Sequence, residues 1–379
     1  MEKYFRIASG ISRWKIDSFL ERFLARIADN SEVGKRFYIF YYSIFDSSYH
    51  KNGSEYMRKE IDRQKDNFDN FSKLSDSWLM RDMEYSLHRY GVSFEEYFIY
   101  RFYDLNKYGR RKFNSLKMQY GYCEQFNTSS IGDICEDKYA TYCLFKEFYK
   151  RNLIIVDSTD IDCSKIESFI QKCKKMIFKP LRGHSGQGVK MLQVHNITRD
   201  TLNGLYEKFG PYILEELINQ GKEMSELHPS SINTVRCATV KTSKGCEVFG
   251  CALRMGKGGS SVDNAGAGGL YATVDFNYGI VVSKAVDNIG NEYLSHPDTR
   301  VIIPGFKLPD WDNAKQMVEE LASIIPQAGL IAWDLAYDEK GWCLVEANDI
   351  GEQYLFQGPI GRGIKPKLLS LLDFSKKLN

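Results

Sequence analysis

Gly329-Leu-Ile-Ala-Trp-Asp-Leu-Ala-Tyr-Asp-Glu-Lys-Gly-Trp-Cys-Leu-Val-Glu-Ala-Asn348 has the composition of a β-hairpin. Apolar, β-branched and aromatic residues continue up to Asp338 and resume at Trp342. The polar link between them, residues 339–341, has the composition of a three-residue loop whose last residue, a glycine, takes a positive φ. We therefore expect two antiparallel strands that meet at this loop.

The loop fixes which side chains of the hairpin face each other. If Asp338 faces Trp342, counting back places Asp334 opposite Glu346, and alternation puts Asn348 on the same face as Glu346. Two carboxylates and one amide oxygen then converge, and hard divalent cations prefer such oxygen ligands. The hairpin alone leaves two interpretations open, a metal site or two carboxylates at a sheet edge that point at water.

Length, charge and cysteine usage restrict the class of protein. A chain of 379 residues can form two or three domains with an ample core. Its formal net charge of +2 gives no general electrostatic reason to expect nucleic acid or an acidic membrane as a partner. The nine cysteines include no CxxC pair, which argues against a disulfide framework or zinc site and for reduced thiols. With no signal peptide or transmembrane segment recognisable in the sequence, we expect a soluble, cytoplasmic protein.

Residues 1–125 are rich in aromatic and charged residues, contain no proline and show helical spacing, which predicts a helical N-terminal region. Aromatic residues crowd positions 94–102, and we expect them to belong to the core. The same is expected of one apolar helix face, made of Ile16, Phe19, Leu20, Phe23, Leu24 and Ile27.

Two segments of this region are polar. Residues 51–73 are dense in charged and amide side chains, which favours a solvated helix or loop. The basic run 107–112, with Arg110 and Arg111, is expected to be wet surface, and contact with a substrate phosphate is the alternative.

After residue 127, short β-rich runs alternate with helices, which predicts an α+β catalytic half. Strands are expected in the hairpin and at residues 176–179, 189–194, 212–217, 234–240, 247–255, 270–275 and 280–285. Helices are expected at residues 137–149, 164–173, 198–209, 314–325 and 367–372.

The first segment with chemical potential is the run 177–189, where a strand delivers Lys179 and a glycine-rich loop follows. Glycines let backbone N–H groups turn toward an anion, so this loop is a candidate cover for a polyphosphate that Lys179 would neutralise. A plain flexible hairpin is the alternative. The candidate groups of the loop are Gly183, His184, Ser185, Gly186 and Gly188.

Two familiar motifs fail in this loop. A P-loop requires lysine and then serine or threonine after its final glycine, but Val189 follows Gly188. The hydrolase elbow G-x-S-x-G fails because Gln187 stands where its last glycine should be.

Further charged groups lie on the strands that follow. The strand 212–218 carries two acids, and Ser231-Ile-Asn-Thr-Val-Arg236 leads into the next strand. A later strand passes Arg254 and opens into a loop with six glycines, Asp263 and Asn264. A mobile loop after an arginine suits a lid over a charged intermediate, and a plain flexible connection is the alternative.

The order of these segments resembles the ATP-grasp superfamily from about residue 137 to the C-terminus. The sequence looks closest to the sugar-transfer-associated ATP-grasp proteins found with bacterial surface-polysaccharide genes. The likeness is carried by Lys179-Pro180 with its loop, Ser231-Ile-Asn-Thr-Val-Arg236, Val262-Asp-Asn264 followed by Gly268-Gly269, and Trp333-Asp334 paired with Glu346-Ala-Asn348.

The resemblance implies an α+β ATP-grasp fold whose two subdomains, residues 126–210 and 211–379, clasp ATP and follow the mainly helical region 1–125. It implies that Lys138, Lys179 and the glycine loop contact the ATP phosphates. The strand beside adenine would be formed by Glu215, Glu216 and Leu217, and Glu223 would bind the ribose.

The same resemblance assigns the reacting end of the site. Asp334, Glu346 and Asn348 would hold Mg²⁺, with Mn²⁺ as a substitute, and Arg236, Arg254 and Asn264 would face the transferred phosphoryl group and the substrate carboxylate. Some ATP-grasp ligases carry an arginine two residues before the first metal acid, and here that position is Ala332. Charge stabilisation would then fall on Arg254 or Arg236.

These roles suit phosphoryl transfer to a carboxylate, followed by attack of an amine that yields an amide, ADP and phosphate. We expect a carboxylate–amine ligase that joins an amino acid or amine to a sugar-linked acid of a surface polysaccharide such as capsule or O-antigen. Two alternatives are a kinase on the same scaffold that phosphorylates a sugar or small-molecule hydroxyl, and a non-catalytic nucleotide-binding scaffold for glycosyltransferases.

Overall fold

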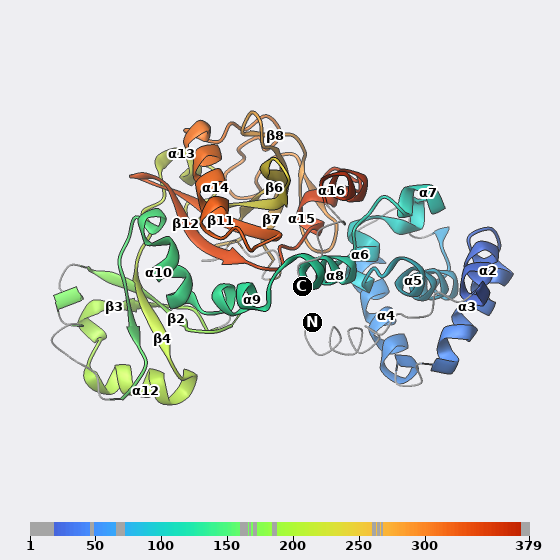
Figure 1. The fold of residues 1–379 in the computed structure, drawn as a ribbon, viewed down its shortest axis with the longest axis horizontal. Helices are drawn as coiled ribbons and strands as arrows, with labels where there is room; N and C mark the ends of the chain where they lie inside the picture. The colour runs from blue at the N-terminus through green and yellow to red at the C-terminus, as the bar shows by residue number, and fades with distance from the viewer. Residues whose placement is uncertain are drawn as a thin grey trace. The chain divides into compact units, whose positions relative to one another are not determined.

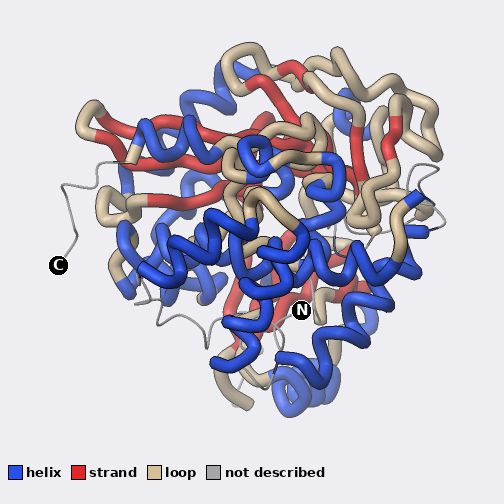
Figure 2. The backbone as a smooth tube through the Cα atoms, turned by 90° about the vertical axis from the view of Figure 1, so that its right-hand side faces the viewer, coloured by secondary structure: helices blue, strands red, loops and turns tan. Residues whose placement is uncertain are grey.

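The computed structural model describes residues 19–45, 49–65, 73–159, 166, 168–169, 173–183, 188–259, 263, 266 and 268–372. The chain forms two compact units (Figure 1). The helical unit comprises Met1–Gly121, Asn288–Asn291 and Glu352–Pro366, and the mixed unit comprises Tyr122–Asp287, Glu292–Gly351 and Lys367–Asn379. Every strand of the described residues, red in Figure 2, belongs to the mixed unit.

The helical unit confirms the prediction of a helical N-terminal region. Its helices begin and end at residues that stabilise helix termini: Ser75 accepts the backbone N–H of Trp78 at the start of α5, and Gly91 ends that helix at φ +70°. The elements of this unit are α2 Phe19–Ala28, α3 Glu32–Phe45, α4 Tyr49–Lys65, α5 Asp76–Tyr90, α6 Phe94–Ile99, η2 Phe102–Asp104, α7 Lys107–Arg110 and α15 Tyr354–Gln357, and α8 Leu116–Phe126 begins in it.

The core of the helical unit agrees with one of the two predicted apolar faces. The aromatic residues of 94–102 are buried, as predicted. The prediction is wrong for Leu20, Phe23 and Ile27, which are 51, 51 and 40% exposed, because α2 packs through its alanines and Leu24 instead. Ile16 and the side chain of Phe19 lie outside the described part of the chain.

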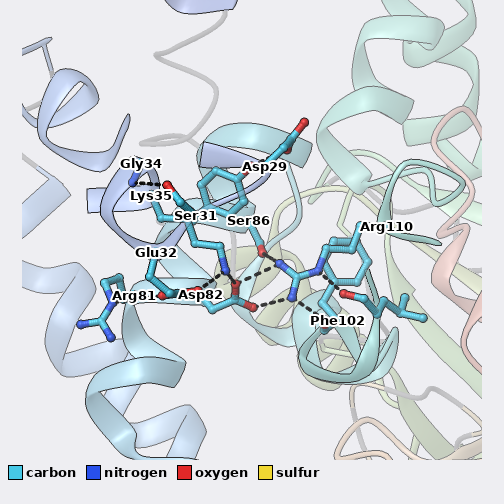
Figure 3. A network of polar contacts seen from close by, with 12 residues as sticks. Asp29, Ser31, Glu32, Gly34, Lys35, Arg81, Asp82, Ser86, Phe102 and Arg110 are labelled. Atoms are coloured by element: carbon cyan, nitrogen blue, oxygen red, sulfur yellow. Dashed lines mark hydrogen bonds and ion pairs between the residues drawn. The ribbon is translucent and has the colours of Figure 1, made fainter. Parts of the chain in front are cut away.

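The two polar segments also fold differently from expectation. The described part of 51–73 belongs to helix α4, which buries Met57 and Ile61 and is therefore solvated on one face only. Arg110 was expected at a wet surface, but it is buried and its Nη2 lies 2.6 Å from Oδ2 of Asp82 (Figure 3). The sequence could not indicate this burial because the partner lies on another helix, α5.

The mixed unit contains two antiparallel sheets. The small sheet has the strand order β1-β4-β2-β3, and the large sheet has the order β10-β9-β7-β6-β5-β11-β12, with β8 paired to β7. The strands are β1 Leu153–Val156, β2 Lys175–Pro180, β3 Lys190–Gln193, β4 Tyr212–Glu216, β5 Thr234–Thr242, β6 Gly245–Met255, β7 Leu270–Asp275, β8 Ile280–Val281, β9 Ala285–Val286, β10 Glu292–Tyr293, β11 Leu330–Asp338 and β12 Gly341–Asn348.

Most predicted elements of this unit are confirmed. The expected strand 280–285 is instead two short strands, β8 and β9, and the strands β1 and β10 were not predicted. The expected helix 164–173 lies largely outside the described residues. The helices are α9 Ser129–Glu136, α10 Lys138–Tyr149, α12 Arg199–Phe209, α13 Lys222–Ser225 and α14 Trp311–Ile324, and α16 Lys365–Leu371 crosses into this unit.

The large sheet has one apolar face and one charged face. Trp333 and Leu335 of β11 join the main core of the unit, where Phe145 of α10 meets Trp333 edge-on at 5.3 Å. Because side chains alternate along a strand, Asp334 between them projects from the opposite face, and Arg236 on β5 is its registered neighbour. The charged groups of the sequence are therefore gathered on one side of the sheet.

None of the helices that the structure describes combines the length and apolarity needed to cross a bilayer.

Candidate functional site

The hairpin of β11 and β12 places Asp334 opposite Glu346, as predicted. The route to this register differs from expectation. Asp338 faces Gly341 rather than Trp342, so the turn has two residues between the strands instead of three, although Gly341 takes the expected positive φ of +96°. A bulge at Val345 shifts the pairing by one residue and restores the predicted partner.

Asp334 is fully buried and holds the two arginines that the sequence singled out. Arg236 donates from Nε to Oδ1 at 2.6 Å and from Nη2 to Oδ2 at 2.7 Å, which is a bidentate fork. Arg254 donates from Nη2 to Oδ2 at 2.9 Å. Three neighbouring strands, β6, β5 and β11, thus bring the expected catalytic cations onto the first expected metal ligand.

The two carboxyls of the hairpin have different electrostatic environments. Burial acts to raise the pKa of Asp334, but the guanidinium groups of Arg236 and Arg254 outweigh it and hold this pKa well below its ordinary value. The side chain of Glu346 is partly buried, with 43% exposed, and this partial burial together with the negative charge of Asp334 raises its pKa. Asn348 completes the group, with its Nδ2 3.5 Å from Oδ2 of Asp334.

Arg254 is fixed by a second pair of side chains. Its Nε donates to Oγ1 of Thr234 at 2.9 Å, and Thr234 in turn donates to Asp263. Asp263 Oδ2 also lies 3.6 Å from Arg254 Nε. The arginine therefore has a defined orientation at the start of the glycine-rich segment.

The small sheet carries a second buried charge cluster. Lys179 on β2 places its Nζ 2.6 Å from Oε2 of Glu215 on β4, and Arg151 donates to the other oxygen of this carboxylate. Arg151 also donates from Nη1 to the carbonyl oxygen of Leu344 on β12 at 2.7 Å, so it connects this cluster to the hairpin. Burial acts to raise the pKa of Glu215, but the charges of Arg151 and Lys179 outweigh it and lower this pKa.

Lys138 links the two clusters electrostatically. It is the first residue of α10, whose N-terminus is capped by the Asp137 carboxylate, and its Nζ donates to the carbonyl oxygen of Gly183 at 2.9 Å. Burial lowers the pKa of Lys138, the charge of Glu346 opposes this, and the charge of Lys179 reinforces it. One lysine therefore experiences both the hairpin carboxylate and the lysine of the small sheet.

The remaining residues expected to bind nucleotide lie in less charged surroundings. Glu216 accepts from the backbone N–H of Asn152 at 2.8 Å, which ties the end of β4 to the start of β1. Leu217 directly follows β4 and is half-buried, and Glu223 is exposed on α13. These three residues are therefore not drawn into the two charge clusters.

The glycine loop is described only at its two ends. Gly183 and Gly188 adopt positive φ values of +132° and +77°, which suits a tight loop. His184, Ser185 and Gly186 lie outside the described residues, as does Asn264 of the second loop.

The hairpin offers the donor set of a hard cation but not a cluster of acids. In the part of the chain that the structure describes, no three His, Cys, Asp or Glu side chains form a metal-binding group. Asp334, Glu346 and Asn348 supply two carboxylates and one amide oxygen, which suits Mg²⁺ when water and phosphate oxygens complete the shell. Both Asp334 oxygens accept from arginines, so a cation would share this carboxylate with them.

The packing around Ala332 leaves no room for an arginine two residues before Asp334. Its side chain is 1% exposed and faces Asn348 across the hairpin. A Cβ built on Gly351 would lie only 2.4 Å from the Cβ of Ala332, so the backbone of residue 351 already occupies the neighbouring space. A long side chain at position 332 would have no room.

Sequence reasoning missed Arg151, Asn152 and Thr234. Arg151 stands in a short polar turn before a four-residue strand, where an arginine is usually exposed. The role of Thr234 could have been inferred from its position. It precedes Arg236 by two residues and therefore lies on the same face of β5.

Residues 117–372 match a family model described as sugar-transfer associated ATP-grasp. A comparison with curated proteins gives no match.

The fold has likenesses among solved structures. D-alanyl-alanine synthetase A from Vibrio cholerae is 10% identical, with 62% of this chain and 60% of that chain covered and a TM-score of 0.38. D-alanine–D-alanine ligase from Bacillus anthracis is 12% identical, with 65% and 69% covered and a TM-score of 0.40. The corresponding ligase from Helicobacter pylori is 15% identical, with 65% and 60% covered and a TM-score of 0.37. The chain thus spans about three fifths of two of these proteins.

Proposed function

Since this chain belongs to the sugar-transfer associated ATP-grasp family, we propose that it is an ATP-dependent carboxylate–amine ligase. The family match covers the mixed α+β part of the chain, which therefore has the ATP-grasp fold, and the helical region precedes it. The observation that carries the proposal is Arg151, which donates both to Glu215, the partner of Lys179, and to the carbonyl oxygen of Leu344 in the hairpin. The charges of Glu346 and Lys179 also both affect the pKa of Lys138. The lysines proposed to bind phosphate and the oxygen ligands proposed for a divalent cation are thus neighbours, as MgATP requires.

We propose that ATP lies between the two charge clusters. Lys138 and Lys179 neutralise its phosphates, with the backbone of the glycine loop 183–188 as a further source of N–H donors. Glu215 already binds Lys179 and Arg151, so its role is to orient Lys179 rather than to contact adenine. Adenine recognition then falls on the backbone of Glu216 and Leu217, and Glu223 binds the ribose from α13.

Asp334, Glu346 and Asn348 are the residues that would hold Mg²⁺. The cation, when bound, neutralises phosphate charge and orients the triphosphate. The chain's own contribution is to keep Asp334 ionised, which Arg236 and Arg254 ensure by lowering its pKa.

The reaction proposed here has two steps. An oxygen of the substrate carboxylate attacks the γ-phosphorus, and the bond from this phosphorus to the ADP oxygen breaks. The nitrogen of the amine then attacks the acyl carbon, phosphate leaves with the oxygen of the broken C–O bond, and the amine loses a proton. Thr234 and Asp334 hold Arg254 in place, which supports its proposed role of stabilising the charge that develops on the phosphoryl group.

The family description, which names sugar transfer, supports our proposal for the substrate class. We propose a sugar-linked carboxylic acid, such as a uronic acid of capsule or O-antigen, and an amino acid or amine as its partner. This role would be consistent with a cytoplasmic enzyme that acts on sugar precursors.

The test is ATP turnover by the full-length protein against a panel of uronic acids and amines with Mg²⁺ or Mn²⁺. Ligation predicts that ADP and free phosphate appear together, that both acid and amine are needed, and that hydroxylamine traps the acyl phosphate. A phosphorylated sugar without free phosphate would identify a kinase instead. Release of AMP and pyrophosphate would exclude the acyl-phosphate route.

A further inference from the structure

Two adjacent helices of the helical unit expose large apolar side chains. The exposed fractions run from 40 to 64%. Single exposed apolar residues are normal, but a contiguous group of this kind usually marks an interaction surface. The group, called the α2–α3 stripe below, consists of Leu20, Phe23 and Ile27 on α2 and Val33, Phe37 and Phe40 on α3.

The stripe has the spacing of a helix-packing seam. On each helix the apolar residues alternate steps of three and four, which is the spacing of a and d positions. Ile27 of α2 lies against Gly34 of α3, since a Cβ at Gly34 would be 2.7 Å from both the backbone and the Cγ2 of Ile27. The two apolar rows therefore meet at Ile27 and Val33, and their spacing suits a partner that also presents helices.

A pocket continues the surface beyond Phe40. It has a volume of about 510 Å³ and lies between α3, α4 and α5. Phe40 belongs to both the stripe and the pocket wall, and Ile39, Met57 and Met80 provide further apolar lining, while serine, arginine and glutamate side chains form the rest of the wall. An apolar side chain of a partner can therefore be inserted beside the stripe, as at the centre of stable interfaces.

The net charge of the segment that carries the stripe, residues 19–45, does not favour an anionic partner. Residues 19–45 contain four basic and three acidic side chains, a net charge of +1. Lys35 is held by Asp82 at 2.9 Å and Asp29 by Arg89 at 3.3 Å, so both are neutralised within the unit. Of the other charged side chains, Arg22, Arg26, Arg36 and Glu32 are exposed. Lipid-binding basic clusters usually contain about four to eight lysines and arginines, more than the three here.

The area of the stripe agrees with the apolar part of a dimer interface. With about 200 Å² for a fully exposed phenylalanine and somewhat less for the aliphatic side chains, the exposed fractions give roughly 600 Å² of apolar surface. A stable interface buries about 800 Å² per partner, of which somewhat more than half is apolar. One identical surface is thus sufficient to cover the stripe.

We propose that a second copy of this chain docks on the α2–α3 stripe. The two copies are related by a two-fold axis, so the same six side chains are buried on both sides and an apolar side chain of each copy enters the pocket of the other. The chain is then a homodimer through its helical unit. This inference is independent of the reaction proposed above.

Analytical ultracentrifugation of the full-length chain over a concentration series tests the proposal. The expected species has twice the monomer mass of 43.7 kDa. Phe37→Glu should raise the dimer dissociation constant about thirtyfold or more, because an aromatic at the centre of an interface contributes at least 2 kcal/mol or so. Leu20→Glu on the other helix should act in the same direction, and Ser54→Trp should weaken the dimer by filling the pocket.

The control is Tyr108→Glu, which changes an aromatic residue of the same unit that is 63% exposed but lies on α7. It should leave the dissociation constant unchanged, and circular dichroism should show every variant to be folded. A parent chain that stays monomeric overturns the proposal, as does a dimer that both glutamate variants leave intact. Binding of the monomer to anionic lipid vesicles that Phe37→Glu abolishes would also overturn it, since a membrane would then be the occupant.

Discussion

Arg236 and Asp334 form a buried bidentate pair, with Nε to Oδ1 at 2.6 Å and Nη2 to Oδ2 at 2.7 Å. The pair joins β5 to β11 at the point where the reacting end of the proposed site begins. Asp334 is therefore both a structural anion and a proposed cation ligand, and the two roles can be separated by experiment.

We predict that Asp334→Asn loses ATP turnover and lowers the free energy of unfolding by about 3 kcal/mol, because Arg236 loses its buried bidentate partner and Arg254 keeps, among the described residues, only Asp263 as an ion-pair partner. Glu346→Gln should lose turnover by at least about a hundredfold but lower the unfolding free energy by less than about 1 kcal/mol, since its side chain is partly exposed. Chemical denaturation measures the unfolding free energy of each variant, and an assay of Mg²⁺-dependent ATP turnover measures its activity. Full turnover by Glu346→Gln would exclude the proposed cation site.

Lys138 is predicted to bind phosphate at a cost in stability. Its pKa in the folded chain lies below the ordinary value, so the folded state releases this proton more readily than the unfolded state and stability rises with pH as the lysine deprotonates. At neutral pH the charged lysine therefore destabilises the protein, and Lys138→Met should raise the Tm by about 1 to 3 °C. The same variant should lose the rise in Tm that MgATP gives the parent. Differential scanning calorimetry of the parent and of Lys138→Met, with and without MgATP, measures both effects. If MgATP raises the Tm of the variant as much as that of the parent, Lys138 does not belong to the site.

Thr234 is predicted to act through Arg254. Thr234→Val removes the hydroxyl that accepts from Arg254 and donates to Asp263, and we expect kcat to fall about tenfold with little change in the KM for ATP. Arg254→Lys should reduce kcat by about a hundredfold or more, because lysine lacks the planar fork. Thr234→Ser keeps the hydroxyl and should restore most of kcat. Steady-state kinetics that show equal losses for valine and serine would indicate a packing role for Thr234 instead.

In the helical unit, Asp82 is predicted to be a stability determinant. Asp82→Asn leaves Arg110 buried without its counter-charge and should cost about 3 to 5 kcal/mol, whereas Asp76→Asn, in an exposed pair with Lys65, should cost less than about 1 kcal/mol. Urea unfolding and hydrogen exchange of α5 measure the difference. Equal costs for the two variants would contradict this assignment.

The same aspartate predicts an acid transition. Burial acts to raise the pKa of Asp82, but the positive charges of Arg110 and Lys35 lower it below the ordinary value. The stabilisation is therefore complete above the unfolded-state pKa and is lost as the pH falls through the folded-state pKa. Hydrogen exchange of α5 should accelerate in this acid range in the parent and be much less pH-dependent in Asp82→Asn.

The sequence predicted the hairpin partners because alternation and loop composition are local properties. It missed the bulge at Val345 because nothing in the residues Leu344-Val-Glu346 marks an unpaired position. The error in the turn and the missed bulge offset each other, so the face of Glu346 was predicted through an incorrect count.

Other errors arise where a partner is distant in the sequence. Periodicity identified the apolar face of α2 but could not show that Ala25 and Ala28 would be buried while Phe23 stays half exposed. Arg110 was assigned to the surface because its partner Asp82 lies on another helix. Local patterns thus predict elements and their faces, and long-range ion pairs decide which charged residues become buried.

The bulge at Val345 also limits how this hairpin can change in evolution. With one unpaired residue in β12, Glu346 shares the face of Asp334, and without it Glu346 would project into the apolar core. A single-residue insertion or deletion within the paired segments 335–338 or 341–345 would therefore move Glu346 to the other face unless a second change compensated it, whereas a change in the length of the loop 339–340 leaves the pairing intact. Related sequences should accordingly vary in length at this loop, and a single-residue change within the paired segments should appear only together with a second compensating change.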